Sequence, residues 1–118
     1  MVLDHHEAKY VSPYACVINN QLCDYENKQL SGVGVVYKFC CYFDSLLNTN
    51  HAQKYLDLVA VGMIADMMAL TSIETKQLIA MGLQAIKNPF LAAMIERNDF
   101  YFKKGVTPER IAFYLAPL

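Results

Sequence analysis

The sequence predicts an α/β fold dominated by helices, with one or two short strands and four to five helices. Short apolar runs bounded by polar residues occur near the start of the chain, and helical periodicity prevails after residue 31. Of the 118 residues, 55% are hydrophobic, enough for one buried core. Short parallel strands need covering on both faces and neighbours on both edges. Two strands therefore indicate the C-terminal part of a larger sheet domain.

Two strands are expected near the N-terminus. The apolar residues Met1–Leu3 run directly into Asp4-His5-His6, which is typical of a short buried strand with a polar exit. A second β-like run, Ala15–Ile18, is closed by the turn-forming pair Asn19-Asn20. Residues 21–29 are polar and are expected to form a loop.

The first helix is expected to begin after Ser31, a favourable N-cap residue, and to end at Asn48-Thr49-Asn50. Its apolar side chains recur at helical spacing and draw one stripe along the helix. The stripe consists of Val36, Phe39, Cys40, Phe43, Leu46 and Leu47.

Further helices are expected in the second half of the chain. One begins near Asn50 or His51 and is apolar around most of its girth, which predicts a buried helix. Thr71 and Glu74 have capping-box spacing for another helix, over roughly Ser72–Ile86.

Proline residues punctuate the remainder of the chain. Asn88-Pro89 separates the helix expected over roughly Ser72–Ile86 from a short helix near Phe90–Arg97. Thr107-Pro108 combines an N-cap with proline at the first helical position, so a last helix is expected to run toward Leu115 and stop at Pro117.

Charge and apolar runs limit the classes of function. The formal net charge is -1, so contact with nucleic acid would require a local site and not a global basic surface. The longest apolar run, Leu58–Ala65, has eight residues, whereas a membrane-spanning helix needs about 20. No contact with a membrane is expected.

The cysteines indicate a reducing compartment. Cys16, Cys23, Cys40 and Cys41 contain no C-x-x-C pair and fit buried, reduced thiols better than a disulfide framework. A soluble, cytoplasmic protein is expected.

Two segments could carry metal chemistry. Asp4-His5-His6 follows an apolar strand, and ligands of open α/β folds bind beyond the carboxyl ends of strands. Imidazole and carboxylate together suit a manganese, iron or zinc ion, although a polar loop with two surface histidines is the plainer interpretation. Asp66 lies between two apolar runs. A cation would stabilise such a carboxylate, and so would a lysine or arginine partner or exposure to water.

Two further segments could bind an anion or nucleic acid. Gly32 and Gly34 follow Ser31 at a helix start, where a phosphate could approach the free N–H groups, or where the helix could simply pack closely. We take Ser31, Gly32 and Gly34 as candidate substrate-binding residues. Arg97 and the run Phe100–Lys104 place aromatic rings beside basic residues, a combination that can stack bases or can belong to the core.

Taken in order, these segments resemble the RecJ family of single-stranded-DNA exonucleases, within the DHH phosphoesterase superfamily. Val2–Glu7, reading VLDHHE, is similar to the family's third motif, and Leu56–Asp66 is similar to its fourth. Cys16–Asn19, Leu30–Lys38 and Ala112–Pro117 resemble further family segments. The resemblance covers essentially the whole chain.

The resemblance implies a metal-dependent phosphodiesterase that uses Mn²⁺ or Mg²⁺. By motif position, His5 and Asp66 would be metal ligands. His6 would face the scissile phosphate, and Asp4 would support the site by orienting an imidazole. Asp4 and His6 are therefore the candidate catalytic residues.

The chain also departs from the family pattern. Family members carry two earlier aspartate-rich motifs that supply the remaining ligands, and the segment that continues beyond Pro117 is cut off at Leu118. Residues 1–118 are therefore expected to form a single partial DHH catalytic domain. We expect this chain alone to bind metal weakly and to leave DNA intact.

The expected function is that of the parent family, degradation of single-stranded DNA from the 5′ to the 3′ end. Two alternatives remain open. One is another DHH phosphodiesterase, acting on cyclic dinucleotides or short RNAs. The other is a non-catalytic protein that keeps the fold and self-associates through its open sheet edge.

Overall fold

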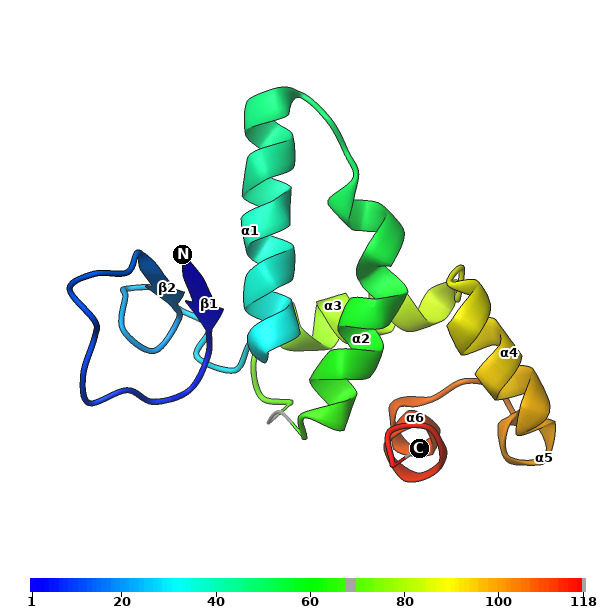
Figure 1. Cartoon of the computed structure of the whole chain (residues 1–118). Coiled ribbons are helices and arrows are strands. Elements are labelled where there is room, and N and C mark those ends of the chain that lie inside the picture. The colour runs from blue at the N-terminus through cyan, green and yellow to red at the C-terminus, as the bar shows by residue number, and fades with distance from the viewer. Residues whose placement is uncertain (68–69, 118) are drawn as a thin grey trace.

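The structure, a computed structural model, describes residues 1–67 and 70–117. Strands β1 (Val2–Asp4) and β2 (Val17–Asn19) pair in parallel, with Asp4 opposite Asn19. The two predicted strands are therefore present, and they lie at one end of the molecule (Figure 1). Their parallel pairing places both carboxyl ends, and the polar residues there, at the same edge.

Helix α1 (Gly32–Leu47) begins after Ser31 as predicted and packs against β1. Its buried residues are Gly34, Val35 and Tyr37. The predicted apolar stripe does not face the core. Phe43 is half exposed and Leu46 is 62% exposed, because α2 and β1 pack against other faces of α1. The stripe that the sequence predicts therefore lies on the uncovered side of α1.

Helix α2 (Leu56–Ala65) is the centre of the fold and follows a short 3₁₀ turn, η1 (Ala52–Tyr55). It packs against α1, α3 and α6, which confirms the prediction of a helix buried around most of its girth. Its buried residues are Leu56, Asp57, Val59, Ala60, Met63 and Ile64.

Helix α3 (Ile73–Gln84) crosses α2 at close range (Figure 1). The approach depends on Gly82, where an added Cβ would overlap the carbonyl oxygen of Leu56. The predicted capping box is wrong. Ser72, and not Thr71, occupies the N-cap position, and the Glu74 carboxylate is bonded to side chains outside the helix.

The last three helices are α4 (Pro89–Arg97), α5 (Asp99–Phe102) and α6 (Pro108–Tyr114), and Figure 1 shows them at the end opposite the strands. Asn88 and Thr107 cap α4 and α6 through their side chains, as the Asn-Pro and Thr-Pro pairs predict. The short helix α5 was not predicted.

The buried carboxylate of Asp57 fixes the start of α4. It accepts hydrogen bonds from the backbone N–H groups of Lys87 and Asn88, at 2.8 and 2.7 Å. Its other oxygen accepts from the N–H of Leu58 at 2.8 Å. Three donors satisfy this charge without a cationic partner, which is how a buried carboxylate is tolerated.

The thiols differ from the sequence-based expectation. Cys16, Cys23 and Cys40 are exposed and Cys41 is partly buried, and all four are free. The prediction of buried thiols is wrong for three of them, because Cys40 lies on the uncovered face of α1 and the other two lie near the strands, outside the helical core.

No single helix in residues 1–67 and 70–117 is long and apolar enough to cross a bilayer. Helices α3 and α4 reach the required length and composition only together, and they are bent by 76° at the break between them.

Candidate metal and phosphate site

The carboxyl end of β1 carries the Asp4-His5-His6 segment, and β2 holds it in place. Asn19, buried at the end of β2, donates from Nδ2 to the backbone carbonyl of His6 at 2.9 Å. Its Oδ1 accepts from the N–H of Gln21 at 2.8 Å. A buried amide with both ends bonded fixes the backbone to which the two imidazoles are attached.

Asp4 orients the imidazole of His6. The Asp4 Oδ1 atom lies 2.7 Å from His6 Nδ1. An ionised carboxylate only accepts, so Nδ1 donates and Nε2 is left free for another group. The hydrogen bond to Asp4, followed by the charge of Asp4, raises the pKa of His6. The same bond lowers the pKa of Asp4.

His5 meets Asp66 across the fold. His5 Nε2 lies 3.4 Å from Asp66 Oδ2, although sixty-one positions separate the two residues in the chain. The imidazole is mostly buried and the carboxylate is partly exposed. The expectation that these two side chains lie close enough to touch one ion is therefore confirmed by their distance.

Asp66 occupies an unfavourable electrostatic position. It is the C-cap residue of α2, where the unpaired carbonyls at the helix end give a negative potential. Among the described residues, the ion-pair contact of Asp66 is with His5, and no lysine or arginine is paired with it. The lysine or arginine partner left open by the sequence is thus not found there. The other alternative, exposure to water, is met, since the Asp66 side chain is 42% exposed. A cation beside Asp66 would also be stabilised.

A hollow of about 400 Å³ opens beside these two residues. Its lining joins the end of β1, the start of α1 and the end of α2. The lining residues are His5, Ser31, Gly32, Val33, Gly62, Ala65 and Asp66. The structure thus brings His5 and Asp66 together with two of the three candidate substrate-binding residues.

Ser31 and Gly32 have distinct roles in this hollow. Ser31 is 2% exposed, and its Oγ finds no hydrogen-bond partner within the described part of the chain. A buried hydroxyl without a partner is costly, so Ser31 is a polar group that the described residues leave unsatisfied beside the hollow. An added Cβ on Gly32 would lie 3.5 Å from His5 Cδ2, so glycine leaves space above the imidazole.

Gly34 does not border the hollow. An added Cβ there would lie 3.1 Å from the side chain of Leu30, and the residue is buried. The structure therefore favours the close-packing interpretation for Gly34, in contrast to the predicted substrate-binding role. Gly34 follows Gly32 by two positions, which turns it to a different side of α1.

Asp4, His5 and His6 also form a compact group of potential ligands. One ligand atom from each lies within 4.8 Å of the others. The rings of His5 and His6 have centroids 4.2 Å apart. Asp4 and His6 are not among the residues that line the hollow.

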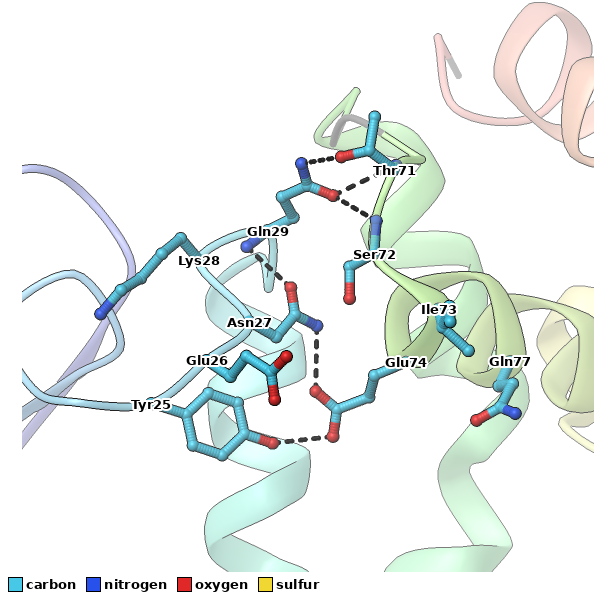
Figure 2. Close-up of a pocket in the computed structure, with 10 residues that line it drawn as sticks. All are labelled: Tyr25, Glu26, Asn27, Lys28, Gln29, Thr71, Ser72, Ile73, Glu74 and Gln77. Atoms are coloured by element: carbon cyan, nitrogen blue, oxygen red, sulfur yellow. Dashed lines mark hydrogen bonds between the residues drawn. The ribbon is translucent and has the colours of Figure 1, made fainter.

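A larger polar pocket, of about 880 Å³, lies between the loop at residues 25–29 and the start of α3. The Glu74 carboxylate accepts hydrogen bonds from Tyr25 Oη at 2.7 Å and from Asn27 Nδ2 at 2.9 Å. Figure 2 shows both bonds. Lys38 Nζ, on α1, is 2.8 Å from the same carboxylate. The network therefore ties the loop, α1 and α3 together.

The hydrogen bonds of this network shift the pKa values of Glu74, Lys38 and Tyr25. Burial opposes the charge of Glu74, but the hydrogen bonds from Lys38, Asn27 and Tyr25 outweigh it and lower the Glu74 pKa. The hydrogen bond to Glu74 raises the pKa of Lys38. Burial, then the bond to Glu74, raises the pKa of Tyr25. Sequence reasoning missed this network, because its partners lie up to 49 positions apart.

The chain is similar to two curated proteins over its whole length. One is from Bacillus subtilis strain 168 and is named as a predicted, SPbeta prophage-derived single-strand DNA-specific exonuclease. The other, from Bacillus phage SPbeta, is named as a predicted single-strand DNA-specific exonuclease. Each is 41% identical over 119 aligned residues, which cover 100% of this chain and 21% of the relative.

The chain thus spans about a fifth of the length of the curated relatives it matches. The predicted resemblance to single-strand DNA-specific exonucleases is confirmed for a segment of such a protein. No model of a known protein family matches the chain. No solved structure matches it either.

Proposed function

We propose that this chain is the segment of a RecJ-like single-strand DNA exonuclease that supplies His5 and Asp66 to a divalent-metal site. The observation that carries the proposal is the 3.4 Å separation of His5 Nε2 and Asp66 Oδ2. The two residues lie in the two segments that resemble the third and fourth motifs of that family. The names of the relatives support the substrate, single-stranded DNA.

The residues present fit a Mn²⁺ or Mg²⁺ ion. One imidazole nitrogen and one carboxylate oxygen are close enough to contact the same ion, and both ligand types suit Mn²⁺. A cation would also offset the unfavourable position of Asp66 at the end of α2. When bound, such an ion activates water and stabilises the oxygens of an in-line displacement.

The remaining residues of the segment position the substrate. His6 is held at Nδ1 by Asp4, and its Nε2 would donate a hydrogen bond to the phosphodiester group in the protonated imidazolium form, which the raised pKa of His6 favours. Asp4 thereby sets the orientation of the imidazole without touching the ion. The buried Ser31 hydroxyl and the first N–H groups of α1 offer donors to a phosphate in the hollow. Gly32 leaves the space that the phosphate needs.

The segment is expected to be inactive alone and to bind metal weakly. His5 and Asp66 give only two protein ligands to an ion that prefers a full set of oxygen and nitrogen donors. Two-metal hydrolysis further needs a carboxylate bridge between ions about 3.5–4 Å apart. We propose that the larger protein supplies these groups. The 5′-to-3′ direction is part of the same proposal and rests on the RecJ resemblance.

A non-catalytic, self-associating protein is the second candidate. The observation that favours it is the uncovered stripe of α1, with Phe43, Leu46 and Leu47 at least half exposed, beside a sheet of two strands. Exposed apolar patches and open edges promote association. Sedimentation velocity of the purified chain distinguishes the two, since this candidate requires a dimer or larger species that the Leu46→Glu variant disrupts.

An exchange of segments tests the nuclease proposal. The corresponding fifth of the Bacillus subtilis relative is replaced by this chain, and the hybrid is incubated with Mn²⁺ and end-labelled single-stranded DNA. The hybrid should release nucleotides from the 5′ end, as the unmodified relative should. His5→Ala in the hybrid should abolish the release, and His51→Ala, an exposed histidine, should not. Equal activity in the two variants would contradict the proposal.

A further inference from the structure

A set of exposed aromatic rings covers part of α5 and α6. Phe100 is 72% exposed and meets Tyr101 edge to face, with ring centroids 5.3 Å apart. Tyr101 stacks on Tyr114 at 4.2 Å and 14°. Lys103 Nζ lies 5.6 Å from the centroid of Phe100. We name Phe100, Tyr101, Lys103 and Tyr114 the aromatic patch.

The core does not account for the aromatic patch. Phe102 is the residue of α5 that is buried, and it anchors this short helix in the core. Phe100, two positions earlier, turns outward, and Tyr101 and Tyr114 are each more than a third exposed. The Tyr101–Tyr114 stack also packs α5 against α6. Together with the largely exposed ring of Phe100 and the cation over it, these rings form a preassembled surface.

The charge of this end of the molecule favours an anionic partner. Residues 89–114 contain four cationic and three acidic side chains, whereas the rest of the chain contains six and eight. The net charge of residues 89–114 is therefore +1, and that of the rest of the chain is -2. Lys103 and Lys104 are adjacent at the end of α5 and both are exposed. An apolar protein surface would not benefit from lysines beside the rings, whereas a phosphate backbone would.

We propose that the aromatic patch binds single-stranded DNA by stacking unpaired bases on its rings, with Lys103 and Lys104 contacting the flanking phosphates. Aromatic rings bind bases of any sequence through their faces, and neighbouring cations follow the backbone. Unpaired bases are required, because a duplex buries the base faces that the rings would contact. The choice of DNA as the ligand rests on the proposed function, but the surface is separate from the His5–Asp66 hollow and needs no metal.

The experiment measures binding of the full 118-residue chain to fluorescently labelled oligothymidylate by anisotropy, at low salt and with EDTA. Phe100→Ala should raise the dissociation constant by about fivefold or more, the lower part of the range for stacking of one base on a ring. Phe90→Ala is the matched control, since Phe90 is a 67% exposed phenylalanine on α4 outside the aromatic patch. His51→Ala, at an exposed position outside both sites, should bind as the native chain does. Because EDTA removes divalent ions, failure of this binding is distinct from failure of the metal site.

Other arms of the experiment identify the contact. A strand of the same length with abasic sites should bind about as weakly to the native chain as thymidylate binds to Phe100→Ala. Oligonucleotide carrying 5-iodouracil should cross-link on irradiation to a peptide that contains Phe100, Tyr101 or Tyr114. The cross-link uses the native chain and holds even where a substitution disturbs folding.

Several results would overturn the proposal. First, the native chain could fail to bind the oligonucleotide. Second, Phe100→Ala and Phe90→Ala could bind it equally well. Third, the abasic strand could bind as tightly as thymidylate, and fourth, the cross-links could be confined to other peptides. A patch that serves only as an apolar contact between protein surfaces would give the second and third of these results.

Discussion

Asn19, at the end of β2, holds the backbone carbonyl of His6, which follows the end of β1, through a 2.9 Å hydrogen bond. The bond joins the carboxyl ends of the two parallel strands at the point where the histidines emerge. The imidazoles are thus positioned by the pairing of β1 and β2 and not by their own segment alone.

Asn19→Ala should therefore destabilise the fold and loosen the histidine segment. The substitution removes a buried side chain that makes two hydrogen bonds, and a loss of about 1–3 kcal/mol in the free energy of unfolding is expected. Urea denaturation followed by circular dichroism measures it. Asn50→Ala, at an exposed position, is the control, and equal midpoints for the two variants would contradict the assignment.

The Glu74 network should give a stability that depends on pH. The folded state lowers the Glu74 pKa below its ordinary value of 4.5, so the stabilisation is fully present above that value and is lost as the pH falls through the folded pKa. The raised pKa of Lys38 sets the alkaline limit, because that stabilisation is lost only as the pH rises through its folded pKa.

Glu74→Gln tests this network. At pH 7 the variant should lose about 1–2 kcal/mol of unfolding free energy, since partial exposure weakens the charged hydrogen bonds. The difference between native chain and variant should shrink as the pH is lowered below 4.5 and through the folded pKa of Glu74. Glu26→Gln, an exposed neighbour, should show no such dependence, and a constant difference for Glu74→Gln at all pH values would refute the account.

The crossing of α2 and α3 should be sensitive to a single methyl group. In Gly82→Ala the new Cβ would overlap the Leu56 carbonyl oxygen, which is backbone and cannot move aside without shifting a helix. Overpacking of this kind costs about 1–3 kcal/mol. Calorimetry should show a lower Tm than in Ala80→Gly, an exposed change on the same helix that alters helix propensity alone. A Gly82→Ala variant as stable as the native chain would mean that the helices lie further apart.

Local signals in the sequence were sufficient for the strands and for most helix boundaries. Asn88-Pro89 and Thr107-Pro108 mark helix starts through their own side chains and backbone, so neighbouring residues suffice to predict them. Ser31 occupies the predicted N-cap position of α1, but its side chain makes no capping hydrogen bond. The buried character of α2 followed from its uniformly apolar sequence, because a helix without a polar face has to be covered.

Features that depend on distant residues were predicted poorly or only through the family resemblance. The spacing of Thr71 and Glu74 fits a capping box, but Glu74 bonds to Lys38 and Tyr25, which its local sequence does not reveal. Helix α1 carries an apolar stripe whichever of its sides the neighbouring elements cover. The periodicity of the sequence therefore could not tell which face of α1 packs against them. The proximity of His5 and Asp66 came from matching two motifs, since nothing in either segment encodes the distance to the other.

The central claim is that His5 and Asp66 hold one divalent cation, and binding of Mn²⁺ to the purified chain tests it most directly. Free Mn²⁺ is measured by electron paramagnetic resonance during a titration, which needs no catalytic activity. The native chain should bind one Mn²⁺ weakly. His5→Ala and Asp66→Asn should each weaken binding by at least about tenfold, while His51→Ala and Asp24→Asn, both at exposed positions, should not change it. Equal affinities in all four variants, or a native chain that binds no Mn²⁺, would contradict the account.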